Sequence, residues 1–260
     1  MDESSRAKGK LLRSGPFRWT GMPEEPWLTT WLPPDYDASD RRYPLAIFFD
    51  GQNMWDDEGS YRGGWQLHRL LDWRACAGKR VPIAVAIDTA GWSRNEILSP
   101  WSRDGAMARG DRMLDWLAFW LVPSLRAQLR VEPGPEAVWI GGSSLGGLLS
   151  LYAFARSPDA FGGAIAMSPS IGLPGGRHGP IHELMASAPR LGRRIYMDAG
   201  ARECECTSIM QHTGELAALL ERRGYRAGDD LLFYADPDGA HDEQSWKRRL
   251  PIALDFMLGG

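Results

Sequence analysis

The chain has 260 residues, of which 43% are hydrophobic and 24% are charged. These values are ordinary for a globular protein and exclude an intrinsically disordered chain and a coiled coil. Acidic residues (33) outnumber basic ones (30), so the basic excess typical of nucleic-acid binding is lacking. No apolar run approaches the roughly 18 residues of a membrane span. Because this length suits one α/β domain, we expect a flexible N-terminal tail over 1–15 and a single domain over 16–260.

The cysteines and the N-terminus bear on the compartment. The first residues lack the apolar core of a secretory signal peptide. Cys76, Cys204 and Cys206 are too few for a disulfide scaffold, and the last two are too close together for a usual metal site. We therefore expect free thiols, a cytoplasmic location, no metal and no organic cofactor. The sequence leaves the oligomeric state open, and a homo-oligomer is compatible with it.

Short apolar runs bounded by Gly, Asp or Pro predict strands, most of them buried on both faces. Two extended segments come first, at 16–19 and 27–32. No helical pattern separates them, so they are expected to pair antiparallel at one edge of a sheet. The later predicted strands cover 44–50, 81–88, 137–141, 161–167, 194–198 and 231–235.

Amphipathic segments with helical spacing alternate with these strands. They cover 64–77, 111–129, 145–156, 181–188, 208–223 and 242–258. Pro251 is expected to kink or split the last one. The alternation predicts an α/β fold with a mostly parallel central sheet and helices on both faces. Ligands of such sheets bind beyond the carboxyl ends of the strands, so the chemistry is expected in those loops.

Residues 142–146 read GSSLG and match the G-x-S-x-G pattern. The match directly follows a predicted strand and precedes a predicted helix, which is the setting of a nucleophile elbow. Glycines are needed there because side chains beside so tight a turn would collide with the strand and the helix. Only Ser144 stands in register, so it is the candidate nucleophile. The alternative is a Gly-rich turn that only packs or binds a phosphate. The sequence disfavours nucleotide binding, because 141–147 lacks the lysine and the spacing of a phosphate loop.

The candidate general base is His241, which follows the last predicted strand. In chain order it comes after the nucleophile and after the candidate acids, as the order of serine, acid and histidine that accompanies a nucleophile elbow requires. The acid that orients its ring should follow the preceding strand, 194–198. Glu203 lies a few residues beyond that strand and is our first choice. The sequence leaves other arrangements open: Glu205, Asp198, Asp236, Asp238, or a Ser–His dyad without an acid.

An oxyanion formed at Ser144 would need two backbone donors. One should be the amide of Leu145, the residue after the nucleophile, and the other should come from the loop after the strand 44–50. Gln52 is the first choice by position and Asn53 follows closely. The plain alternative is a tight turn, because Asp, Gly and Asn favour turns.

These features together resemble the putative esterase family of the α/β-hydrolase superfamily, which includes esterase D, enterochelin esterases and feruloyl esterases. The resemblance spans about 16–258 and is carried by separated blocks: WLPPDYD, FFDGQNMWDD, RNEILSPW, WIGGSSLGG, MSPSIG, YMDAGARE and HDEQSWKRRLP. It implies the α/β-hydrolase fold, with Ser144 as nucleophile, His241 as base and Gln52 at the oxyanion hole. Family members often carry Asp where Glu203 stands. They act on many substrates, so the resemblance points to the chemistry more than to the ligand.

The function expected is a serine carboxylic-ester hydrolase that forms an acyl-enzyme on a small or medium ester. The expected partner is a small-molecule ester, with no nucleic acid and no membrane. The same triad on thioesters or peptides is the second hypothesis. A catalytically silent scaffold that binds a ligand is the third.

Tryptophan is abundant, with 12 residues, of which eleven lie at or before Trp139. Four lie in or beside loops that follow strand ends, where they could stack on a sugar or aromatic ring of the substrate. The alternative is that they pack these loops onto the sheet. The candidate substrate-binding residues are Trp55, Trp92, Trp101, Trp246 and Asn53.

Overall fold

The computed structural model describes residues 8–19, 25–89, 91, 93–101, 108–172, 180–190, 193–203 and 207–259. Within these residues, eight strands form one sheet in the order β1-β2-β4-β3-β5-β6-β7-β8. The strands are β1 (Lys10–Ser14), β2 (Leu28–Leu32), β3 (Leu45–Phe48), β4 (Ile83–Ile87), β5 (Val138–Ser143), β6 (Gly163–Met167), β7 (Arg194–Gly200) and β8 (Leu231–Asp236). Strands β3 to β8 run parallel, and β2 pairs antiparallel with both β1 and β4.

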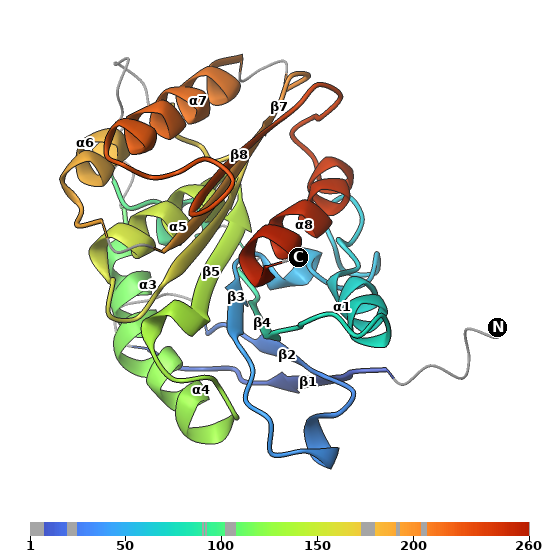
Figure 1. Ribbon diagram of the computed structural model, residues 1–260. Helices are drawn as coiled ribbons and strands as arrows, with labels where there is room; N and C mark the ends of the chain where they lie inside the picture. Colours follow the sequence, from blue (N-terminus) through green and yellow to red (C-terminus); the bar gives the residue numbers. More distant parts are fainter. Residues whose placement is uncertain are drawn as a thin grey trace.

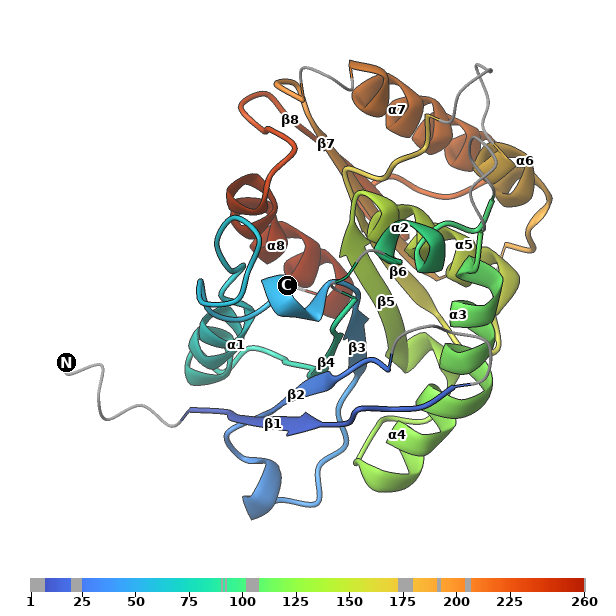
Figure 2. The ribbon, with the colours of Figure 1, turned by 180° about the vertical axis from the view of Figure 1, so that it is seen from behind.

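Helices cover both faces of the sheet, with α1 and α8 on one face and α3 to α7 on the other (Figures 1 and 2). The helices are α1 (Leu67–Cys76), α2 (Arg94–Ile97), α3 (Gly110–Trp116), α4 (Val122–Gln128), α5 (Leu145–Arg156), α6 (Pro180–Ser187), α7 (Thr207–Arg222) and α8 (Glu243–Leu258). Within the described ranges, no helix has the length and apolar character that crossing a membrane requires.

The strand β3 illustrates how the sheet divides two cores. Leu45 and Ile47 belong to the core under α5, whereas Ala46 and Phe48 belong to the core under α8. Successive side chains of a strand point to opposite faces, and both faces are covered here. This explains why the strands are continuous apolar runs, and it confirms the predicted α/β architecture.

The antiparallel edge is confirmed, but its outer strand lies earlier than predicted. The strand is Lys10–Ser14, paired with β2, and not 16–19. Residues 10–14, which we expected in a flexible tail, therefore belong to the sheet. All five side chains are exposed, so no alternation of apolar and polar residues marks this strand in the sequence. Its pairing depends on backbone hydrogen bonds to β2.

The last helix is not split, as one of the two predicted effects of Pro251 would require. α8 continues from Glu243 to Leu258 with Pro251 inside it. Proline removes one hydrogen bond of a helix interior. Around it, α8 buries Leu250, Ala253, Leu254 and Met257 against the sheet, and this packing keeps the helix continuous.

The start of α8 is fixed by an N-cap at Asp242 and by a bond from the preceding loop. The side chain of Asp242 accepts a hydrogen bond of 2.8 Å from the Ser245 amide, and the Ser245 hydroxyl accepts one of 3.0 Å from the Ala240 amide. The first bond satisfies an amide that a helix start would leave unpaired, and the second ties the loop before the helix to its first turn. His241 lies in the chain between Ala240 and Asp242, and both of these residues take part in the two bonds.

We expect Asp242→Ala to lower the free energy of unfolding by about 1 kcal/mol, because it removes this cap. Asp242→Ser should restore most of the loss, since serine is also a good N-cap residue. Gln244→Ala, at an exposed position in the same turn, is the matched control. Urea unfolding measures all three, and equal stability of Asp242→Ala and the wild type would contradict the cap.

Candidate active site

Ser144 occupies a strained turn between β5 and α5. Its backbone angles are φ 57° and ψ −119°, and a positive φ is unfavourable for a residue with a side chain. Its amide donates to the Met167 carbonyl at 2.9 Å, and its carbonyl accepts the first α5 hydrogen bond from Leu148 at 3.0 Å. The turn predicted from the G-x-S-x-G match is therefore present.

Two glycines allow helix α5 to begin so close to the sheet. A Cβ on Gly142 would lie 3.1 Å from the Gly146 backbone, and a Cβ on Gly146 would lie 3.2 Å from the Phe49 Cβ. Both contacts are tighter than a side chain usually makes. The glycines of the motif thus allow the start of helix α5 to lie directly against the sheet, as the sequence predicts.

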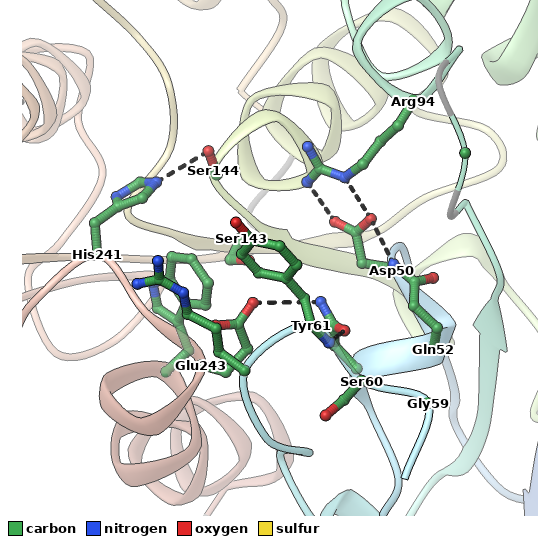
Figure 3. Close-up of a pocket in the computed structure, with 14 residues that line it drawn as sticks. Asp50, Gln52, Gly59, Ser60, Tyr61, Arg94, Ser143, Ser144, His241 and Glu243 are labelled. Atoms are coloured by element: carbon green, nitrogen blue, oxygen red, sulfur yellow. Dashed lines mark hydrogen bonds and ion pairs between the residues drawn. The ribbon is translucent and has the colours of Figure 1, made fainter. Parts of the chain in front are cut away.

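His241 lies between β8 and α8 and reaches Ser144. Its Nε2 is 3.1 Å from the Ser144 Oγ, although the two residues are 97 positions apart in the chain. Its ring meets the Trp246 indole edge to face, with centroids 5.0 Å apart. The imidazole is therefore positioned from two sides, and Figure 3 shows its ring directed toward Ser144.

Glu203 lies three residues beyond β7 and completes the chain of contacts. Its Oε2 is 3.1 Å from the His241 Nδ1. Its Oε1 accepts hydrogen bonds of 2.6 Å from the Ser168 hydroxyl and 2.6 Å from the Gly200 amide. The carboxyl group is 1% exposed, so these partners replace water around it.

Burial disfavours the charged form of Glu203, but the hydrogen bonds from His241, Ser168 and Gly200 outweigh it. The pKa of Glu203 is therefore lowered from its ordinary value. The carboxyl is ionised near neutral pH and acts as an acceptor toward the His241 ring. An imidazole held in this way has Nδ1 as a donor, which leaves Nε2 free to accept the serine proton.

The other acid candidates have different partners. Asp198 is fully buried and accepts hydrogen bonds from the Ser168 amide and the Tyr196 hydroxyl. Asp236 and Asp238 form ion pairs with arginines, at 2.9 Å and 2.6 Å. Glu205 lies outside the described residues.

Ser144 opens onto a cavity of about 480 Å³. Its walls come from Ser144, His241 and the loops that follow β3 and β4. The other lining side chains include Asp50, Gln52, Asn53, Ser60, Tyr61, Arg62, Arg94, Glu243 and Trp246. Ser170 approaches Ser144 from the β6 loop, with 3.1 Å between the hydroxyl oxygens.

The loop that carries Gln52 is held by an ion pair. Asp50 has a left-handed backbone (φ 56°) and is 3% exposed. Arg94 donates to its two carboxylate oxygens at 2.7 Å and 2.6 Å, and the Thr89 hydroxyl donates at 2.6 Å. Gln52 follows in the first turn of a 3-10 helix (Gly51–Asn53), where amides lack partners within the helix. Figure 3 shows this ion pair on the right and His241 on the left.

The predicted aromatic wall is divided. Trp246 and Asn53 line the cavity. Trp55 is buried beside His68, and Trp101 packs edge to face on Tyr152. Neither of these two is among the described residues that line the cavity, so their contacts are those of packing. Trp92 lies outside the described residues.

Several site residues were not singled out from the sequence. Tyr61 and Arg62 line the cavity from an exposed loop that carries no motif. Asp50 and Arg94 belong to blocks that the resemblance includes, but their pairing joins segments 44 residues apart. Ser168 lies in the block MSPSIG, after a predicted strand, and this position was the one available signal.

The model of a family described as Putative esterase matches residues 20–257. The chain belongs to the Putative esterase family. It is therefore a hydrolase that acts on ester bonds. An uncharacterized Bacillus subtilis (strain 168) protein, YbbA, is 24% identical over 246 residues, which cover 89% of this chain and 92% of that protein.

Solved structures share the fold of this family member. A ferulic acid esterase superposes with a TM-score of 0.74 and 16% identity, covering 98% of this chain and 99% of its own. The siderophore hydrolase EstA from Aspergillus nidulans gives 0.72 and 16%, covering 98% and 96%. The enterobactin esterase FES from Shigella flexneri gives 0.71 and 21%; 96% of this chain is covered, but only 58% of that longer protein.

The lowered pKa of Glu203 predicts how stability depends on pH. The ionised carboxylate stabilises the fold above its unfolded pKa, and this contribution is lost as pH falls through the lower folded-state value. Glu203→Gln cannot ionise. We expect this variant to have a lower unfolding free energy than the wild type at pH 7. The difference between the two proteins should shrink as the pH falls from about 5 to about 3. Urea titrations across this range measure it, and a deficit independent of pH would contradict the assignment.

Proposed function

We propose that this hydrolase cleaves carboxylic esters through an acyl-enzyme on Ser144. The observation that carries the proposal is the unbroken series of contacts from Ser144 Oγ to His241 Nε2, and from His241 Nδ1 to the buried Glu203 carboxylate. Nucleophile, base and orienting acid in this geometry define the triad arrangement.

The first half of the reaction forms the acyl-enzyme. His241 takes the proton from Ser144 as its Oγ bonds to the ester carbonyl carbon, which gives a tetrahedral oxyanion. The carbon–oxygen bond to the alcohol then breaks, and the protonated imidazole gives its proton to the leaving alcohol. Glu203 stays ionised and stabilises the imidazolium.

The second half repeats these steps with water. His241 removes a proton from water as the water oxygen bonds to the acyl carbon. The second tetrahedral intermediate collapses, the bond to Ser144 Oγ breaks, and the serine recovers its proton from His241. The products are the carboxylic acid and a free enzyme.

The oxyanion is proposed to bind the amides of Leu145 and Gln52. Leu145 is the first residue of α5 and Gln52 lies in the first turn of a 3-10 helix. Neither position gives its N–H a partner within its helix, so both amides can donate to a ligand. The Arg94–Asp50 ion pair supports this role for Gln52 because it fixes the backbone two residues earlier.

The substrate is proposed to be a small or medium ester with an aromatic portion. The cavity volume suits such a ligand. Tyr61 and Trp246 give the cavity aromatic surface, and Asn53 adds a polar group. Two structural relatives, a ferulic acid esterase and an enterobactin esterase held with a dihydroxybenzoyl compound, favour an aromatic group over a sugar.

The nucleophile is tested with Ser144→Ala on p-nitrophenyl esters of increasing acyl length. We expect kcat to fall by about 10³-fold or more, and we expect fluorophosphonate to label the wild type but not the variant. Ser157→Ala, just past the other end of α5, is the matched control. It should hydrolyse the esters and be labelled by fluorophosphonate like the wild type. Retained activity or labelling of Ser144→Ala would refute the assignment.

The aromatic preference is tested at Tyr61, whose side chain lines the cavity while remaining 76% exposed. We expect Tyr61→Ala to raise KM several-fold for methyl benzoate and methyl ferulate, and to leave KM for ethyl acetate nearly unchanged. Trp73→Ala removes a 52% exposed aromatic from α1 and should change neither. An equal KM change for aliphatic and aromatic esters would contradict the aromatic subsite.

A further inference from the structure

A buried arginine lies behind the acid of the triad. Arg249 of α8 is 1% exposed, and a guanidinium removed from water is costly unless carboxylates compensate it. Three carboxylates do so from three different loops or strands. Its nitrogens lie 3.5 Å from Asp198, 3.8 Å from Glu203 and 4.0 Å from Asp236. Its direct hydrogen bond, at 2.9 Å, goes to the hydroxyl of Ser168.

Ser168 connects this arginine to Glu203. Its Oγ has three partners within hydrogen-bond distance: Arg249 Nη2 and Trp246 Nε1, both at 2.9 Å, and Glu203 Oε1 at 2.6 Å. The first two groups can only donate, so the hydroxyl accepts from both. Its single proton must then go to Glu203. The direction of every hydrogen bond at this hydroxyl is therefore fixed by its partners.

The backbone of Ser168 is held in place as firmly as its hydroxyl. Its φ is 42° and the residue is 0% exposed. Its amide donates to the Asp198 side chain and carbonyl, each at 3.0 Å. The other carboxylate oxygen of Asp198 accepts from the Tyr196 hydroxyl at 2.9 Å. A serine in a left-handed conformation persists where its surroundings impose it, and such sites cluster at active sites.

We propose that Arg249 and Ser168 are positioning residues of the esterase reaction: the arginine orients the Ser168 hydroxyl, which fixes Glu203 so that it holds the His241 ring toward Ser144. Neither residue touches the reacting atoms. The proposal rests on the proposed triad mechanism and deepens it. It assigns a role to a buried cation that the reaction steps themselves do not use.

The arrangement has an electrostatic consequence. Arg249 lies 3.8 Å from the Oε1 atom of Glu203, whereas His241 contacts the other carboxylate oxygen, so the arginine adds a positive charge that favours the ionised form of Glu203. The other ionisable groups facing this cluster are Asp198, Asp236, Arg248, Tyr196 and Tyr234. Burial raises the pKa of Asp198 to about 6, against the lowering effect of Arg249. Removing the cation should therefore make Glu203 take up a proton at higher pH.

The test uses pH profiles of kcat/KM for Arg249→Met and Arg249→Lys with an ester that the wild type hydrolyses. On the acid side of the profile, kcat/KM falls with decreasing pH, and we call this part the acid limb. We expect its midpoint to lie about one pH unit higher in Arg249→Met than in the wild type. In Arg249→Lys, which keeps the charge, the midpoint should return toward the wild-type value. Arg74→Met is the matched control. Arg74 is also 1% exposed and is paired with Asp255 of α8, so it should lose stability without moving the limb.

A second variant keeps the cation and cuts its connection to the acid. Ser168→Ala should lower kcat roughly 10- to 100-fold with a smaller change in KM. In a Glu203→Ala background there is no carboxylate to position, so Ser168→Ala should cause little further loss. If Arg249→Met does not fold, this double-mutant cycle carries the test.

Two results would overturn the proposal: an equal loss from Ser168→Ala with and without Glu203, or an acid limb that Arg249→Met leaves in place. The wild type and Ser144→Ala are measured in the same series. An active wild type with an inactive Ser144→Ala supports the triad whatever the cycle gives. Additive effects in that setting reject the positioning role alone, whereas activity in Ser144→Ala rejects both.

Discussion

The backbone turn at Ser144 is the constraint on which the rest of the candidate site depends. A φ of 57° at a serine is retained only because its surroundings fix it. The Met167 carbonyl holds the Ser144 amide, and glycines at 142 and 146 let α5 start against the sheet. The turn presents the hydroxyl to the cavity and leaves the Leu145 amide outside the hydrogen bonds of the helix. Both proposed half-reactions use these two consequences.

The order of the strands explains how the remaining groups meet there. Ser144 follows β5, Glu203 follows β7 and His241 follows β8, and β6 lies between β5 and β7 in the sheet. The loop after β6 therefore reaches both sides. Its Ser170 contacts Ser144, and its Ser168 contacts Glu203. A loop that supplies none of the three proposed triad residues thus links Ser144 to Glu203, and through Ser168 it links both to the buried Arg249.

The sequence predicts the strands and helices well because both faces of the sheet are buried. The strands are then short, continuous apolar runs bounded by turn residues, and the helices that cover them carry one apolar face at helical spacing. It also predicts Ser144, His241 and Glu203 as candidates, since each follows a strand end in the required chain order, and the structure brings the three together. It does not predict Arg249, which reads as a surface arginine of an amphipathic helix; its burial depends on carboxylates from three other segments. The edge strand 10–14 is missed for a similar reason, because backbone pairing alone defines it.

The central claim is that the ester's acyl group is transferred to Ser144. It is tested most directly by quenching the enzyme during turnover of a slowly deacylated aromatic ester and locating the acyl group by peptide mass spectrometry. The account predicts a burst of about one alcohol per active site and an acyl group on the peptide that carries Ser144. Steady turnover with no acylated peptide, or an acyl group on another residue, would contradict it.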